Sequence, residues 1–339
     1  MISTIKKYIA DKGYVCREGL VEGFCLSLKC RPFTLLCGHS TTDMTVLPRL
    51  FAEAVGAKFL CLQVRPDWQD SSDLFGHLDL MGNFVPGPVI DYLKQAQNDP
   101  RKPYFLCFDG VLLDRAEYYL REILTSVESR EGDSPLPLVT MAYYGRDTEA
   151  ADKYGEIPSL PNVYIVGTVN MDEASKPINQ KLLDRVHAMA YEAGAVVRTG
   201  EDTCPVATPM DNARLQTEYF RLEQCDREAL LPYFARFETL NKILMKASAY
   251  MGYKLLNDAV LYLMHARAVD LPEQQALDHV IAHKLLTRVQ GSAKTVQPVL
   301  EALLSECTEY PYTAGKIRVM LDGCEKDGYC GFYEEECLC

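Results

Sequence analysis

The first 191 residues alternate short apolar runs with stretches of helical periodicity, and this alternation is the strongest constraint on the fold. Runs of this length, separated by helices, are typical of parallel strands that are buried on both faces. The sequence therefore predicts an α/β fold in which helices flank a parallel five-stranded sheet. We expect the strands at residues 33–37, 58–64, 103–108, 162–168 and 187–191, with helices at 45–55 and 114–129.

The pattern changes after a polar connector at residues 194–213. From about residue 214 onward, apolar residues recur at helical spacing in successive stretches. Together with helices expected within residues 1–30, this predicts two domains. Residues 1–213 form the α/β domain with its N-terminal helices, and residues 214–339 form a helical domain with a cysteine-rich tail. The expected C-terminal helices lie at 230–237, 240–251, 255–268 and 272–286.

Composition limits the cellular setting and the partners. The formal charge of −12 argues against a wholly basic nucleic-acid binder. The N-terminus lacks the apolar stretch of a signal peptide, and no apolar run is long enough to span a bilayer. We expect a cytoplasmic protein that has no membrane partner. Most of its 13 cysteines are scattered, as buried small hydrophobes are.

Four cysteines gather near the C-terminus. A metal site would favour tighter paired spacings such as Cys-x-x-Cys. We therefore expect a frayed, reduced tail, and stoichiometric zinc in the purified protein would overturn that expectation. These residues are Cys324, Cys330, Cys337 and Cys339.

A loop between the first strand and its helix stands where a phosphate-binding loop is expected. Such loops read Gly, four residues, Gly-Lys and then Ser or Thr. Gly38 and Thr45 have the right separation. Asp43 replaces the second glycine, and Met44 replaces the lysine. The loop residues are Gly38, His39, Ser40, Thr41, Thr42, Asp43, Met44 and Thr45.

Three polar or loop residues each follow an expected strand. Gly38, Asp109 and Asn170 come after the first, third and fourth runs. Because the carboxyl ends of parallel strands meet at one edge of a sheet, we expect these residues to share that edge. Without further information, Asp109 would also suit a helix cap and Asn170 a turn.

Several motifs in order resemble the McrB-type branch of AAA+ ATPases and GTPases. The resemblance spans nearly the whole chain. It implies a nucleotide-binding α/β domain, a helical lid, and rings in which nucleotide sits between subunits. The motifs are residues 64–68, 71–76, 104–109, 116–119, 127–130, 166–173, 183–185, 283–291 and 327–332.

The resemblance assigns roles to individual residues. Gly38, Ser40 and Thr45 match the phosphate loop, and Thr45 with Asp109 matches the Mg²⁺ position. Asn170 matches the sensor that orients water. Arg185 matches the arginine finger that reaches a neighbour's site, although it would equally suit an ordinary ion pair with Asp184 or another acid. Arg288 matches a lid sensor. The expected cofactor is ATP or GTP with Mg²⁺.

The departures from the family pattern weaken this site. Thr41 and Asp43 replace loop glycines, Gly110 replaces a water-activating glutamate, and Leu112 replaces an asparagine. Two unit charges about 4 Å apart interact by roughly 4 kcal/mol at an effective dielectric constant of about 20, and Met44 forfeits an attraction of that order. Loss of the carboxylate costs a further ~10²–10⁴ in rate. Tight binding and efficient hydrolysis are both unexpected.

Three functions remain open from the sequence. The first is a degenerate AAA+ subunit, impaired in its own hydrolysis, that joins a ring with an intact McrB-like subunit and a McrC-type nuclease and lends Arg185 to its neighbour. DNA restriction or anti-phage defence is implied by the resemblance alone, and any role of DNA is indirect. The second is a non-enzymatic scaffold or sensor that uses the 130–161 loop. The third is an active ATPase or GTPase with a rebuilt site.

Overall fold

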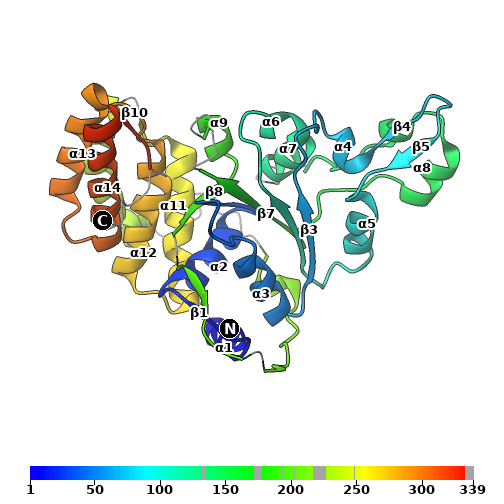
Figure 1. Cartoon of the computed structure of the whole chain (residues 1–339), viewed down its shortest axis with the longest axis horizontal. Helices are drawn as coiled ribbons and strands as arrows, with labels where there is room; N and C mark the ends of the chain where they lie inside the picture. Colours follow the sequence, from blue (N-terminus) through cyan, green and yellow to red (C-terminus); the bar gives the residue numbers. More distant parts are fainter. Residues whose placement is uncertain are drawn as a thin grey trace.

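The computed structural model describes residues 1–130, 135–171, 178–192, 194–201, 203–216, 227–247 and 249–332. A central parallel sheet has the strand order β3-β6-β7-β2-β8 (Figure 1). Every neighbouring pair in it is parallel. The five predicted strands are confirmed, with shifts of a residue or two at their ends. They are β2 Phe33–Gly38, β3 Lys58–Gln63, β6 Tyr104–Asp109, β7 Val163–Asn170 and β8 His187–Tyr191.

The side chains of the sheet divide between two apolar cores, as the period of two along a strand requires. On β6, Phe105 and Cys107 face one core, and Leu106 and Phe108 face the other. Burial on both faces explains why the central strands read as continuous apolar runs.

Helices cover both faces of this sheet. The first core also contains apolar residues of α1, α2 and α3, and the second contains those of α5, α6 and α7. The expected helix at 114–129 is interrupted at Leu120, between α6 and α7. The helices of this part are α1 Ile2–Asp11, α2 Leu20–Cys30, α3 Val46–Ala54, α4 Ser72–Phe75, α5 Ile90–Asn98, α6 Ala116–Tyr119, α7 Arg121–Ser129, α8 Thr148–Tyr154 and α9 Gln180–Leu183.

Two short antiparallel ribbons were not expected from the sequence. The ribbon β1 Tyr14–Cys16 with β9 Val196–Arg198 ties the N-terminal helices to the connector after β8. The ribbon β4 Gly76–Leu78 with β5 Phe84–Pro86 lies, together with α8, in an arm that projects beyond the sheet (Figure 1). Strands of three residues carry too little periodicity to be read from sequence.

The C-terminal part is helical, as predicted, and stands beside the β8 edge of the sheet (Figure 1). Its helix α11 packs on α2 and shares the first core, whereas α10, α13 and α14 contribute to a third core. The expected helices at 230–237 and 240–251 merge largely into one. The helices are α10 Arg227–Leu244, α11 Tyr253–Ala266, α12 Glu273–Val280, α13 Ala293–Glu306 and α14 Pro311–Asp327.

The expected reduced tail is wrong for Cys324 and Cys330, which form a disulfide. The chain reverses after α14 at Gly328, whose φ of 69° suits glycine, and β11 Tyr329–Cys330 then pairs with β10 Gly291–Ser292. This reversal brings both sulfurs into the third core. Cys337 and Cys339 lie outside the described residues.

Across the described ranges, no helix combines the length and hydropathy needed to cross a bilayer. Among the same residues, no three or more His, Cys, Asp or Glu side chains gather in a group suited to hold a metal ion.

Candidate functional site

The carboxyl edge of the sheet brings three of the sequence-derived residues together. Gly38 of β2 is in register with Asn170 of β7. Asp109 ends β6, the next strand along. The three residues therefore end three adjacent strands, with Asp109 level with a position two residues before Asn170. The candidate site therefore occupies the position that ligands take in open α/β sheets.

Gly38 is required by the packing of the sheet. A Cβ atom at this position would lie 2.3 Å from the carbonyl oxygen of Tyr191, the last residue of β8. No side chain fits at that distance from backbone. The glycine at position 38 is thus explained by the close β2–β8 contact, whether or not phosphate binds.

The loop after Gly38 makes hydrogen bonds to itself. The backbone N–H of Thr42 donates to the carbonyl of His39 at 2.9 Å, and that of Met44 donates to the carbonyl of Thr42 at 2.9 Å. The Thr41 N–H donates to Nδ1 of His39 at 3.4 Å. A phosphate cradle needs such N–H groups turned toward the ligand, in backbone that alternates between right- and left-handed conformations. Residues 38–45 are all described, and none has a φ in the left-handed region.

Met44 and Thr45, the two loop residues nearest α3, make contacts within the protein. Met44 is only 3% exposed and packs in the first core with residues of α3. The Thr45 hydroxyl, the group matched to the Mg²⁺ position, donates to Oδ1 of Asp43 at 2.7 Å. Tyr191 donates to the Asp43 carbonyl at 3.4 Å and so fixes the loop from β8. The residues present do not fit a nucleoside triphosphate with Mg²⁺.

Asp109 is held by a threonine of the next strand. The Thr168 hydroxyl donates to Oδ1 of Asp109 at 2.7 Å and accepts the N–H of Gly110 at 2.9 Å. Gly110 has a φ of +74°, a conformation that L side chains rarely adopt. A glutamate there would be strained although the space around it is open. The turn after β6 therefore favours glycine at the position where the resemblance leads one to expect a glutamate.

Arg185 is paired within its own chain. Its Nε donates to Oε2 of Glu128 at 3.0 Å, and Oε1 of the same carboxylate accepts Nζ of Lys254 at 3.1 Å. Partial burial acts to raise the pKa of Glu128, but Lys254 and Arg185 outweigh it and hold that pKa below its ordinary value. Glu128 ends α7 and Lys254 lies in the first turn of α11, so this cluster joins the sheet domain to the helical part.

A second ion pair makes the same connection. Arg288, in the helical part, donates to Oδ1 of Asp184 at 2.5 Å. The Arg288 side chain is 9% exposed, whereas that of Asp184 is 49% exposed. Arg288, which matches a lid sensor, thus contacts Asp184, the residue before Arg185. Neither Arg185 nor Arg288 has a hydrogen bond to the described loop at 38–45.

A buried charged cluster lies where α2 meets α11. Arg31 donates from Nε and Nη2 to the two carboxylate oxygens of Asp258, at 3.1 and 2.9 Å, and Lys284 donates to the same carboxylate at 3.3 Å. All three side chains are buried. Burial alone would raise the pKa of Asp258, but the two cations hold it below its ordinary value. Lys284 lies in a π-helical turn, Ile281–Leu285, which continues α12.

Buried histidines adjoin this cluster. His187 of β8 stacks on Tyr262 of α11, with ring centroids 5.6 Å apart, and neither of its ring nitrogens has a hydrogen-bond partner among the described residues. Desolvation, and then the charge of Lys284, hold the pKa of His187 well below its ordinary 6.5. The ring is therefore neutral in the folded protein.

Sequence reasoning missed the partners that define these contacts. Thr168 could have been found, because it precedes Asn170 by two positions on one strand and must face the end of β6. Glu128 gives only a helical pattern in the sequence, with nothing to mark it as the partner of Arg185. Lys254 and Asp258 carried no signal, since Glu128 and Arg31, with which they pair, lie 126 and 227 residues away in sequence.

Comparison with known proteins adds little about chemistry. The model of a domain of unknown function (DUF8727) matches residues 206–329, which make up most of the helical part. No curated protein matches the chain. Among solved structures, a candidate ATPase from Cytophaga hutchinsonii is similar at 15% identity and a TM-score of 0.37, covering 94% of this chain and 85% of that one. An overlap with that TM-score carries no inference about function.

Proposed function

We propose that this chain is a non-hydrolysing subunit of an AAA+-type assembly, one that acts on an intact ATPase or GTPase partner rather than on nucleotide of its own. The observation that carries the proposal is the loop at 38–45, whose amide groups and threonine hydroxyl bond to the loop itself. The family resemblance and the parallel five-stranded sheet support the class of assembly.

Arg185 is the residue through which the chain acts on its partner. Its side chain is 30% exposed, and its position after α9 and before β8 is far in the chain from the altered loop. An arginine finger stabilises transition-state charge in another subunit's site and does not need a competent site in its own subunit. Restriction of foreign DNA with a McrC-type nuclease is the setting that the resemblance suggests, in a cytoplasmic ring.

Mixing this chain with an intact McrB-like ATPase from the same genome tests the proposal. We expect the partner's Mg²⁺-dependent hydrolysis to rise on addition of the wild-type chain, and Arg185→Ala to remove the increase. Fingers supplied by a neighbour are worth about 10³–10⁵ in rate in the strongest cases. No change in the partner's activity across an excess of this chain would overturn the proposal.

Two controls separate the finger from its ion pair. Arg101→Ala removes an exposed arginine that pairs with Asp211 at 2.9 Å, and it should leave the stimulation unchanged. Lys254→Ala removes the other partner of Glu128 while Arg185 stays. If Lys254→Ala abolished stimulation as fully as Arg185→Ala, the cluster would be acting through the position of the helical part, and the finger role would be wrong.

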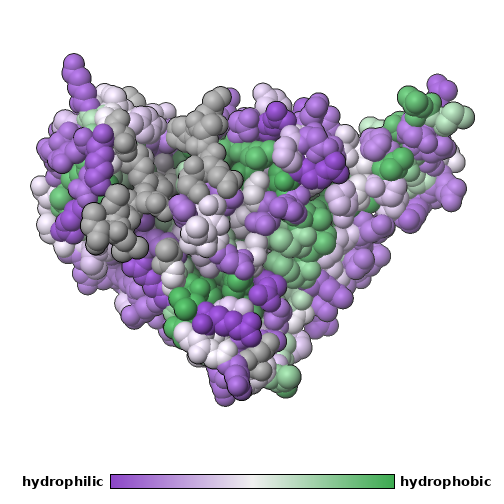
Figure 2. Space-filling view, viewed as in Figure 1, coloured by the Kyte–Doolittle hydropathy of each residue, from purple (hydrophilic) through white to green (hydrophobic). Residues whose placement is uncertain are grey.

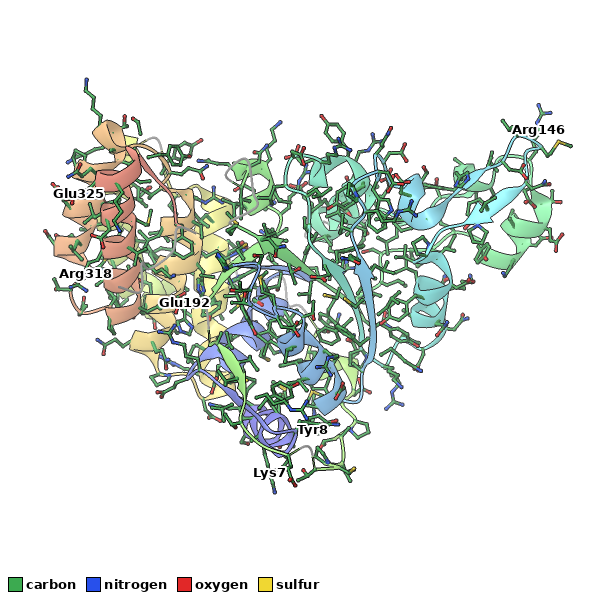
Figure 3. All side chains as sticks on the ribbon, in the orientation of Figure 1. Lys7, Tyr8, Arg146, Glu192, Arg318 and Glu325 are labelled. Carbon is green, nitrogen blue, oxygen red and sulfur yellow. A yellow bond between two sulfur atoms is a disulfide. The ribbon has the colours of Figure 1, made fainter. Side chains whose placement is uncertain are left out.

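A non-enzymatic scaffold is a second candidate, and the projecting arm favours it. Leu80 and Met81 lie between β4 and β5 and are 106% and 85% exposed. Figure 2 shows apolar residues gathered on this arm, and Figure 3 places Arg146 at its outer end. The turn is well ordered, because Asp79 accepts the N–H groups of Met81 and Asn83 at 2.8 Å.

The scaffold candidate makes a different prediction for the same mixture. Leu80→Ser with Met81→Ser should abolish co-elution with the partner, whereas Arg185→Ala should not. Binding that is indifferent to nucleotide would agree with a scaffold. Retained co-elution of the double variant would exclude the arm as the contact.

A further inference from the structure

Two cysteines face each other on neighbouring strands near the candidate site. Cys61 of β3 and Cys107 of β6 are direct partners in the parallel register, so their side chains leave the sheet on the same face. Neighbouring strands lie about 4.8 Å apart, within the ~4.4–6.8 Å that separates the Cα atoms of a disulfide. The two thiols are hydrogen-bonded to each other.

The two thiols differ in access to solvent. β3 is the edge strand of the sheet, and Cys61 is exposed on it. Cys107 lies one strand further in and is fully buried. A small oxidant can therefore reach the sulfur of Cys61 but not that of Cys107.

Their protonation also differs. The hydrogen bond with Cys107 lowers the pKa of Cys61, against the opposing effect of partial burial. The same hydrogen bond, and then burial, raise the pKa of Cys107 well above its ordinary value. The thiolate is the reactive form of cysteine, so the exposed member of the pair is also the more nucleophilic at neutral pH.

We propose that Cys61 and Cys107 form a reversible thiol–disulfide site that reacts with hydroperoxides. The Cys61 thiolate attacks one peroxide oxygen, the O–O bond breaks, and the other oxygen leaves as an alcohol or water after taking a proton. Cys61 is then a sulfenic acid. The sulfur of Cys107 attacks that of Cys61, the S–S bond forms as the S–O bond breaks, and the departing hydroxide takes the Cys107 proton as water.

The arrangement of the two residues suits this second step. Cys107 approaches from the neighbouring strand β6, on the side of Cys61 away from the open edge of the sheet. The sum is two thiols and one hydroperoxide giving a disulfide, an alcohol and water. A dithiol reductant returns the pair to thiols, and an exposed disulfide on an edge strand is of the readily reduced kind. The bond would fasten β3 to β6 two residues before Asp109.

Hydrogen peroxide and peptide mapping test the site. The reduced full-length chain is treated with hydrogen peroxide, digested without reductant, and examined by mass spectrometry. We expect a peptide pair joined through Cys61 and Cys107. The Cys324–Cys330 bond in a sample that was never reduced serves as the reference for detecting a disulfide-joined peptide. Sulfinic or sulfonic acid at Cys61 with no joined pair would overturn the proposal, because Cys107 would then not have reacted.

Variants assign the two roles. Cys107→Ser should leave Cys61 as a sulfenic acid that dimedone traps, with roughly tenfold more label than the exposed Cys204 carries. Cys61→Ser, at an exposed position that folding tolerates, should abolish the joined pair and leave Cys107 unlabelled. Cys204→Ser is the matched control and should change nothing. Equal labelling of Cys61 and Cys204 would contradict the proposed activation of Cys61.

Discussion

At the scale of single residues, the departures from the nucleotide-binding pattern are supported by their local surroundings. Met44, which replaces the loop lysine, fills space in the first core. Gly110 has the left-handed φ that the turn after β6 requires. Each replacement therefore serves the packing of the present chain, and reverting one residue alone works against its neighbours.

Restoring the lysine of the loop should lower stability without restoring binding. In Met44→Lys an amine enters a site that is 3% exposed, which costs roughly 1–3 kcal/mol where the polar group finds no partner. Met44→Leu keeps the volume and should cost less than about 1.5 kcal/mol. Urea unfolding measures both changes. Wild-type stability together with saturable ATP binding by the lysine variant would show that the loop opens easily.

Removing the buried carboxylate should be among the most damaging single changes. Asp258→Asn leaves the charges of Arg31 and Lys284 buried without their counter-charge, and breaking a buried pair in this way costs about 3–5 kcal/mol. Asp211→Asn, which breaks an exposed pair with Arg101, should cost far less, because solvent screens that pair. Similar losses in the two variants, measured by urea unfolding, would contradict the role given to the buried cluster.

At the scale of elements, the sequence predicts the central strands well because they are buried on both faces. A continuous apolar run such as that of β6 fits a buried parallel strand and little else. The strand order then brings Asp109, Gly38 and Asn170 to one edge of the sheet. The ribbon of β4 and β5 was missed because its strands are only three residues long. An ion pair of Arg185 with an acid was one of the two alternatives from the sequence, and the structure gives Glu128 as that acid. Glu128 itself could not be singled out, since it gave only a helical pattern.

The contact between β8 and the helical part should be sensitive to acid. The folded-state pKa of His187 is held below its ordinary 6.5, whereas the unfolded chain takes up a proton near that value. Unfolding is thus favoured as pH falls below about 6.5, by up to roughly 1.4 kcal/mol per pH unit for each such histidine. The neighbours His279 and His283 have lowered pKa values as well, chiefly through burial.

A substitution isolates this effect. His187→Phe keeps the stacking on Tyr262 and removes the titrating group, so it should flatten the fall in stability between pH 6.5 and 5. Urea unfolding at a series of pH values measures the slope. A slope as steep as that of the wild type would mean that His187 does not titrate on unfolding in this range.

At the scale of the whole molecule, the altered loop and Arg185 belong to different parts of the structure. The loop lies at the carboxyl edge of the sheet and is closed by its own hydrogen bonds. Arg185 lies in the cluster with Glu128 and Lys254, which joins the sheet to the helical part. A chain of this kind can lose its own nucleotide site while it keeps a surface for a partner.

Calorimetric titration of Mg²⁺–ATP and Mg²⁺–GTP into the purified chain tests directly whether its own loop at 38–45 binds nucleotide. We expect no saturable binding of either nucleotide up to about 1 mM. A Kd of that size corresponds to a binding free energy of only ~4 kcal/mol. Saturable binding with a Kd below roughly 100 µM that is lost in Asp109→Ala would contradict it.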